Sequence, residues 1–284
     1  GGLDRYYFLA DLVDHFDQNA DDIIDRLKQL CAKVFRKEHL TVQWICEKEG
    51  IGVLETGTLD FAEKLSTQPV SLSPVKVDVG VFVPKDAVRE NPKSEALTTN
   101  GSVQYNAVAG NLKEMGFEYH GSMQVLTNIL NNEYFWTNVR VKGGAYGCSM
   151  QVSDMGIGYI ASYRDPNLFE TYEVYHQAAD FVEHLELDER ELVKYIIGAI
   201  GTIDVPVSIT MKADRAVHAY IAGRSQEIRQ KRREQLLDTT VDDLRALAPV
   251  IAAIADSPYR CVIGSESRIN KEKEAFDRVG RLLV

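Results

Sequence analysis

Two adjacent glycines in the middle of the chain separate a helical pattern from a strand pattern. Upstream of them, apolar residues recur at helical spacing from about His120 onward. Gly143-Gly144 ends this pattern, because glycine admits backbone angles that other residues disfavour and lets another backbone approach closely. Downstream, residues 145–152 alternate with the period of a strand. The sequence therefore predicts a helix followed directly by a strand, with a glycine hinge between them.

Two side chains that can bind a peptide flank this hinge. Arg140 can hold a carboxylate or a peptide carbonyl through two parallel hydrogen bonds, and Tyr146 can donate one hydrogen bond to an oxygen that gains negative charge. Together they are suited to gripping and polarising an amide. A structural alternative stays open, because an arginine at a helix C-terminus also caps carbonyls and a tyrosine in a strand is often ordinary core.

Three segments of the chain, NEYFWTNVRVKGGAYGCSM, SYRDPNLFETYEVY and ELVKYIIGAIGTID, follow one another in a recognisable order. With them the chain resembles the C-terminal half of the presequence-protease branch of the insulinase/pitrilysin superfamily of zinc metallopeptidases. The resemblance covers most of the chain and is strongest from about Gln104 to Thr240. In that family one long chain forms four related α+β lobes. The first lobe carries the zinc motif H-x-x-E-H, and the last supplies an arginine and a tyrosine to the same site across a closed chamber.

The resemblance implies roles for the residues at the glycine hinge. Arg140, with Gly143 and Gly144, would hold the substrate backbone, and Tyr146 would hydrogen-bond the scissile carbonyl as it becomes an oxyanion. It further implies that zinc is bound by an N-terminal half, that peptides are the substrates, and that this chain is inactive alone. Two other functions remain open: a naturally separate, non-catalytic subunit that pairs with a zinc-bearing chain, and a structural or interaction module of the same fold.

No zinc motif occurs in this sequence in either direction, so we expect no metal site in the chain. The nearest pattern runs from Asp180 to His184 and has an Asp where the first His should stand. It falls at the end of an amphipathic helix, where a solvated turn is the expected structure. His120 lies near the position at which the first lobe of the family would carry its motif, but Gln124 leaves that pattern degenerate.

Composition excludes several classes of partner. The formal net charge of -10 argues against nucleic acid or an anionic membrane as a ligand, because both require a basic surface. Four scattered cysteines without a C-x-x-C pattern favour a reducing compartment. The sequence contains neither an apolar run of membrane-spanning length nor a signal-peptide pattern, although it begins with Gly1-Gly2. We therefore expect a bacterial cytoplasm or an organelle matrix.

The patterns divide the chain into three parts, with an α+β fold overall and a mixed or antiparallel sheet packed against several helices. Residues 1–67 read as one short and one longer helix over residues 4–37, a strand (residues 40–47) and a further helix, and resemble the end of a preceding lobe. Residues 68–93 hold half of the prolines and predict an extended linker, with a strand from Val75 to Val83. Residues 94–284 predict a complete lobe.

Within the last lobe, the patterns predict a first strand at Val103–Ala109 and a hairpin near Asp154. Asp165-Pro166 is expected to open a helix, Asp188 and Glu191 have the spacing of a capping box, and three helices are expected between residues 208 and 255. A strand near residues 259–263 and a charged helix would end the chain.

Three further features receive structural interpretations. The basic residues Arg229, Lys231, Arg232 and Arg233 are interleaved with glutamates and predict a solvated helix face. Gly198 and Gly201 predict close helix packing, since no phosphate-loop pattern surrounds them. Cys148, two residues after Tyr146, is expected to be a small buried residue.

Overall fold

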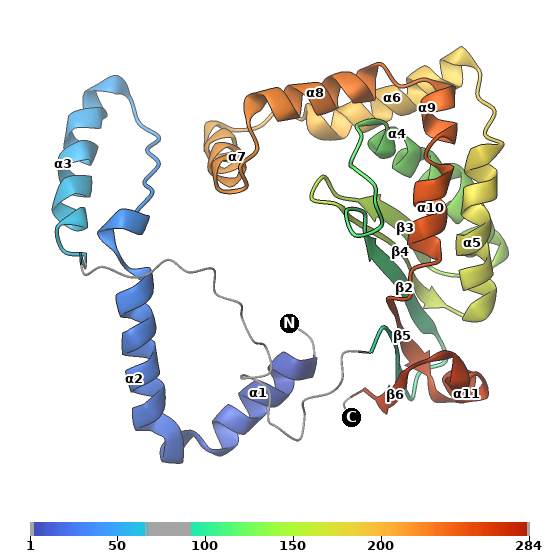
Figure 1. The fold of residues 1–284 in the computed structure, drawn as a ribbon, viewed down its shortest axis with the longest axis horizontal. Helices are drawn as coiled ribbons and strands as arrows, with labels where there is room; N and C mark the ends of the chain where they lie inside the picture. Colours follow the sequence, from blue (N-terminus) through green and yellow to red (C-terminus); the bar gives the residue numbers. More distant parts are fainter. Residues whose placement is uncertain (1–2, 66, 68–91, 283–284) are drawn as a thin grey trace. The chain divides into compact units, whose positions relative to one another are not determined.

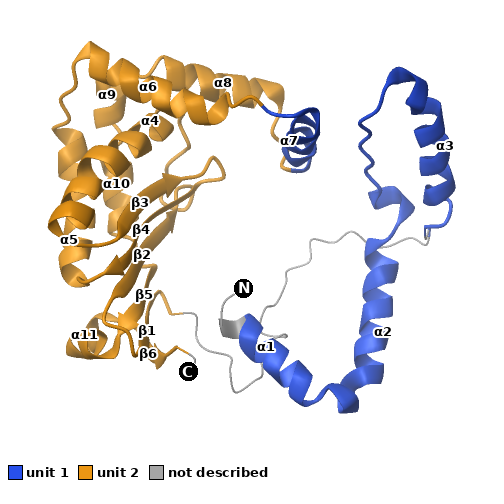
Figure 2. Ribbon diagram, turned by 180° about the vertical axis from the view of Figure 1, so that it is seen from behind, with its two compact units in different colours: residues 1–90, 207–221 blue, residues 91–206, 222–284 orange. Residues whose placement is uncertain are grey.

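The computed structural model describes residues 3–65, 67 and 92–282, which form two compact units. The first comprises Gly1–Glu90 with Val207–Ile221, and the second comprises Asn91–Pro206 with Ala222–Val284 (Figures 1 and 2). The predicted linker at 68–93, with its expected strand from Val75 to Val83, lies almost wholly outside the described residues. The three-part division of the chain stays a prediction.

The second unit is built on a mixed sheet of six strands within the described residues, in the order β3-β4-β2-β5-β1-β6. Strand β1 runs parallel to β5 and β6, whereas β2, β3, β4 and β5 pair antiparallel where they are neighbours. The predicted α+β class with a mixed sheet is confirmed. The strands are β1 Ser94–Thr99, β2 Gln104–Asn111, β3 Gly147–Val152, β4 Ile157–Asp165, β5 Arg260–Ser265 and β6 Arg278–Arg281.

Helices cover one face of this sheet, and Figure 1 shows α5 and α10 lying along it. Val108, Ile160 and Val262 point into the helical layer and are fully buried, while Tyr105 and Tyr163 of the opposite face are exposed. This alternation follows from the period of two along a strand. The helices of the unit are α4 Ser122–Ile129, η4 Leu130–Lys142, α5 Phe169–Glu183, α6 Glu189–Ile203, α8 Gln226–Leu237, α9 Val241–Arg245, α10 Ala248–Ala255, α11 Glu266–Lys271 and η5 Lys273–Ala275.

Several predicted elements of this unit are confirmed. The hairpin near Asp154 is the antiparallel pair β3 and β4, and the capping box at Asp188 and Glu191 begins α6. The predicted central helix is present, but its second half, η4, has the wider π-helical winding. Gly198 packs closely as predicted, because an added Cβ would lie 2.6 Å from the side-chain nitrogen (Nδ2) of Asn128. Gly201 faces open space instead.

Four predictions about the number and bounds of elements are wrong. A strand, β1, precedes the predicted first strand, because Ala96, Leu97 and Thr98 are buried in succession and show no alternation. Helix α5 begins at Phe169, since Asp165 ends β4 as a buried residue and caps no helix. Four helices, not three, occupy residues 208–255, and the chain continues past α11 into the edge strand β6, which is too short to show a period.

The first unit consists of helices among its described residues. The two predicted N-terminal helices are α1 Leu3–Asp14 and α2 Phe16–Val34, and they are followed by η1 Lys37–His39, η2 Lys48–Gly50, α3 Ile51–Ala62 and, later in the chain, α7 Ile209–Ile221. The strand predicted at residues 40–47 is absent from this described segment. Val42 and Trp44 carry its alternating pattern but are exposed, and the described residues of the unit offer no strand with which they pair.

Candidate functional site

The glycine hinge ends η4 and turns the chain into β3. Gly144 has a φ of 81°, in the left-handed region that residues with a Cβ rarely adopt. A Cβ on Gly143 would lie 2.6 Å from the carbonyl oxygen of Val139, so glycine is required at this position also. The amides of Gly143 and Gly144 donate to Asn138 and Arg140 in the helix end. The hinge therefore holds Arg140 and Tyr146 at a defined separation.

The structure brings Arg140 and Tyr146 into direct contact. The guanidinium of Arg140 donates through Nη1 to the backbone carbonyl of Tyr146, and its carbon lies 5.3 Å from the centre of the Tyr146 ring. On its other side Arg140 stacks on Trp136, with 4.3 Å between the guanidinium carbon and the ring centre. One arm of the guanidinium thus orients the residue, which is half-buried, and its other nitrogens have no hydrogen-bond partner among the described residues. Among the described residues its side chain caps no carbonyl of its own helix.

Tyr146 lies on the surface, immediately before β3, with 54% of its area exposed. Its ring packs against Tyr163 at 5.3 Å between ring centres. Gly147 permits this packing, because a Cβ there would lie 2.5 Å from the Tyr163 ring. Within the described part of the chain the Tyr146 hydroxyl has no hydrogen-bond partner. A core role for Tyr146 is therefore wrong, and its hydroxyl is free to donate to a ligand.

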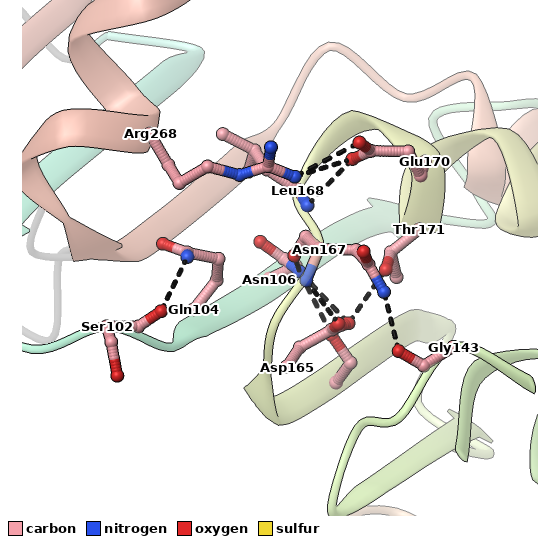
Figure 3. A network of polar contacts seen from close by, with 11 residues as sticks. Ser102, Gln104, Asn106, Gly143, Asp165, Asn167, Leu168, Glu170, Thr171 and Arg268 are labelled. Carbon is pink, nitrogen blue, oxygen red and sulfur yellow. Dashed lines mark hydrogen bonds and ion pairs between the residues drawn. The ribbon is translucent and has the colours of Figure 1, made fainter. Parts of the chain in front are cut away.

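The turn between β4 and α5 is hydrogen-bonded to both ends of the hinge. The amide of Tyr146 donates to the carbonyl of Arg164 at 3.3 Å, and the side-chain amide of Asn167 donates to the carbonyl of Gly143 at 2.7 Å. Between these residues lies Asp165, which is fully buried and accepts several hydrogen bonds (Figure 3). The hinge is consequently tied at both ends to one turn.

Cationic groups dominate the immediate surroundings of Tyr146. The guanidinium carbon of Arg164 lies 5.9 Å from the Tyr146 ring centre. In the described residues neither Arg140 nor Arg164 forms an ion pair with a carboxylate. Unneutralised guanidinium groups beside an exposed phenol favour a carbonyl oxygen or an anion as ligand. Trp136, Tyr163 and Arg164 were not among the predicted site residues, although all three lie in segments that carry the family resemblance.

Two other candidates, His184 and Cys148, have side-chain or backbone partners within their own unit. Across the described ranges, no three His, Cys, Asp or Glu side chains gather as a metal site requires. His184 follows the last turn of α5, and its imidazole lies within bonding distance of the backbone carbonyl and the carboxylate of Asp180, which raise the pKa of the imidazole. Burial raises the pKa of the Cys148 thiol to about 12, which keeps it protonated and unreactive at neutral pH.

The basic residues of α8 are partly neutralised within the chain. Arg232 pairs with Asp154 at 2.7 Å, and Arg233 pairs with Asp204 at 2.6 Å. This helix therefore presents no uniform cationic surface for a polyanion. None of the helices in the described segments is both long and apolar enough to cross a lipid bilayer.

Comparison with known proteins gives consistent matches. The family model described as the PreP C-terminal domain matches residues 94–265. Protein HypA of Clostridium perfringens is 33% identical over 278 residues, which cover 98% of this chain and 27% of that protein. Presequence protease 1, chloroplastic/mitochondrial, of Arabidopsis thaliana is 29% identical over 288 residues, covering 100% of this chain and 26% of that protein. This chain thus spans about a quarter of the length of these relatives.

The chain also has likenesses among solved structures. The crystal structure of a peptidase M16 inactive domain from Pseudomonas fluorescens aligns with a TM-score of 0.45 at 13% identity, covering 72% of this chain and 49% of that one. The crystal structure of pitrilysin aligns with a TM-score of 0.44 at 12% identity, covering 88% of this chain and 31% of that one.

Proposed function

Because the chain belongs to the PreP C-terminal domain family, a family of peptidase domains, we propose that it is the substrate-gripping C-terminal half of a zinc-dependent endopeptidase. The reaction would be hydrolysis of peptides inside a chamber closed by an N-terminal, zinc-bearing half. In this proposal Arg140 binds the peptide backbone, Gly143 and Gly144 let that backbone approach closely, and Tyr146 donates to the carbonyl that is cleaved.

One observation carries the proposal: Tyr146 presents an exposed, unpartnered hydroxyl on a rigid support beside Arg140. A preorganised donor at the site of a developing oxyanion contributes about 3 to 4 kcal/mol to transition-state stabilisation in other hydrolases. The support supplies that preorganisation, since the backbone of Tyr146 is bonded on one side to Arg140 and on the other to Arg164. The hydroxyl therefore needs little reorganisation to meet the substrate oxygen.

The residues of this chain do not fit a zinc site. Over the described residues, His, Cys, Asp and Glu side chains form no cluster of three, and the only near-motif is the Asp180–His184 turn. Structural and catalytic zinc sites need at least three protein ligands. We assign the metal to the N-terminal half, and the part of the reaction attributed to this chain is binding and hydrogen-bond donation alone.

The exposed edge of β3 is partly occupied by a side chain. This supports the proposal that the peptide substrate pairs with a sheet of the zinc-bearing half and not with this one. An extended peptide can join a sheet only where an edge strand offers free backbone groups. On β3, the side-chain amide of Asn131 occupies those of Met150: its oxygen accepts from the Met150 amide at 2.7 Å and its nitrogen donates to the Met150 carbonyl at 3.0 Å. A substrate strand would have to displace Asn131 to pair here.

We further propose that residues 1–67 are the end of a preceding lobe, that 68–93 link it to the last one, and that 94–284 form that last lobe. Helix α2 supports the first assignment. Its apolar stripe includes Leu27 and Leu30, which are 54% and 55% exposed, and none of its residues is buried in the described structure. An amphipathic helix of this kind gains stability by covering such a stripe.

A separate, non-catalytic subunit is the alternative that shares this site. The two possibilities differ in where the zinc motif is encoded: in the same reading frame upstream of Gly1 for one long enzyme, or in a different gene for a subunit. A purely structural or interaction module would require neither the exposed hydroxyl of Tyr146 nor the free cation beside it.

The proposal is tested by replacing Tyr146 with Phe in the full-length protein. We expect turnover of a peptide substrate to fall by about a hundredfold or more with little change in KM, because an oxyanion donor acts in the transition state. Tyr259→Phe is the matched control, since Tyr259 is similarly exposed, at 51%, and precedes β5. Unchanged turnover for Tyr146→Phe would remove this residue from the mechanism.

A further inference from the structure

Arg164 has a backbone conformation that its side chain disfavours. Its φ is 49°, and no other described residue apart from glycines has a positive φ. Left-handed backbone angles are unfavourable for residues with a Cβ, and Arg lacks the short polar side chain that lets Asn or Asp adopt them. Such strain persists where the surrounding structure enforces it, and it often occurs at functional sites.

The strained residue forms part of a β-bulge. On β2, Gln104 and Asn106 pair with Asp165 and Ser162 of β4, so that the single residue Tyr105 faces both Tyr163 and Arg164. Bulges of this kind bend a strand and redirect a side chain, and they are frequent beside active sites. The exposure pattern records the change, because Tyr163 and Arg164 are both exposed where a regular strand would alternate.

The bulge directs two consecutive residues to the same target. The ring of Tyr163 lies 5.3 Å from the Tyr146 ring, and the guanidinium carbon of Arg164 lies 5.9 Å from it. In a regular strand these neighbours would point to opposite faces of the sheet. The carbonyl of Arg164 also accepts the amide of Tyr146. Arg164 therefore contacts both the backbone and the ring of Tyr146.

A buried network holds the bulge in place. The carboxylate of Asp165 accepts hydrogen bonds from the hydroxyls of Ser162 at 2.7 Å and Thr171 at 2.8 Å, and from the Asn106 amide group at 3.3 Å. It also accepts the backbone amide of Asn167 at 2.9 Å, and Asn167 in turn bonds the hinge (Figure 3). Satisfying a buried carboxylate with this many donors makes one conformation of the turn strongly preferred.

We propose that Arg164 is the positioning residue of Tyr146: the bulge at Tyr163–Arg164 fixes the direction of the phenol, with Asp165 and Asn167 as its anchor. The role at the substrate rests on the proposed function of Tyr146. The orientation of the ring does not, because it is a property of this chain alone.

Two variants of Arg164 distinguish an effect on the orientation of Tyr146 from an effect on the stability of the fold. Arg164→Gly and Arg164→Asn both suit a positive φ and both keep the backbone carbonyl, but they remove the guanidinium. We expect their melting temperatures to equal or exceed that of the parent chain, because backbone strain is relieved. We expect the ring resonances of Tyr146, assigned by their loss in Tyr146→Phe, to move toward solvent-exposed values. Arg229→Asn removes the same charge from α8 and should leave those resonances in place.

In the full-length protein the same variants should lower kcat by about tenfold with KM unchanged, as expected when a donor is misaligned and binding is retained. Arg164→Lys keeps a cation at this position and should restore part of the loss. Unshifted Tyr146 resonances in Arg164→Gly, together with parental kcat, would overturn the inference. If Tyr146→Phe leaves turnover unchanged while Arg164→Gly shifts the resonances, the proposed function fails but the positioning role stands.

Discussion

Arg140 contacts two neighbouring residues and also has donors left for a ligand, and both depend on the shape of its guanidinium. Its planar guanidinium stacks on Trp136 and donates to Tyr146, while its remaining donors have no partner among the described residues. Lysine carries the same charge but has neither the planar surface nor the fork of donors. Lysine therefore cannot make the same contacts at this position, although it carries the same charge.

We expect Arg140→Lys in the full-length protein to raise the KM for a peptide substrate by about tenfold, with a smaller effect on kcat, because a point charge cannot replace bidentate binding. Steady-state kinetics would measure this change. Lys142→Arg serves as control, since the Lys142 ammonium bonds only Asn138 in the described structure. Parental KM in Arg140→Lys would reduce Arg140 to a local structural contact.

At the scale of elements, η4 and β3 are joined by more than the hinge. The side chain of Asn131, on η4, satisfies both backbone groups of Met150, a residue that is fully buried on β3. A buried backbone group without a partner costs about 1–3 kcal/mol. One asparagine therefore fastens the helix to the edge of the sheet and also closes that edge to other strands.

In chain 1–284, Asn131→Ala should lower the free energy of unfolding by about 1–3 kcal/mol, because the Met150 amide and carbonyl lose their partner. Urea denaturation would measure the loss. Asn132→Ala is the neighbouring control, since Asn132 is exposed and, among the described residues, its side chain bonds only Asn128, four residues earlier. A change of no more than about 0.5 kcal/mol is expected there. Equal effects of the two variants would argue against the edge role of Asn131.

For the whole molecule, the described residues supply a core to the sheet unit and leave the helices of the other unit largely uncovered. The core cluster includes Val108, Ile160 and Tyr175, all in the second unit. The apolar residues of α2 lie outside it. Stability of chain 1–284 should therefore come mainly from the second unit and should not depend on a metal.

We expect chain 1–284 to hydrolyse no peptide, with or without added Zn²⁺, and to show the same melting temperature in chelator as in zinc. A ligand shifts stability only if it binds the folded state, and the described residues form no metal cluster. Differential scanning calorimetry would show the thermal midpoint, and a quenched fluorescent peptide would report hydrolysis. A zinc-dependent rise in melting temperature would contradict the assignment of the metal to the other half.

Local patterns were reliable where one interaction dominates. The capping box at Asp188 and the alternation along β3 and β4 were predicted correctly, because a capping box spans only four residues and an antiparallel hairpin needs only its own two strands. The strand predicted at residues 40–47 failed for the opposite reason. Its alternation is present, but a strand forms only with a partner, and the described residues provide none there.

By itself, the amino-acid sequence determined the α+β class and the glycine hinge and proposed Arg140 and Tyr146 as candidates, because backbone freedom, hydrophobic period and side-chain chemistry are properties of neighbouring residues. Only the tertiary structure decided that Tyr146 is exposed, that Arg140 touches it, and that Arg164 approaches the same ring from a bulge in another strand. These contacts join residues through the register of β2 and β4 and the buried carboxylate of Asp165, and no local pattern encodes such register.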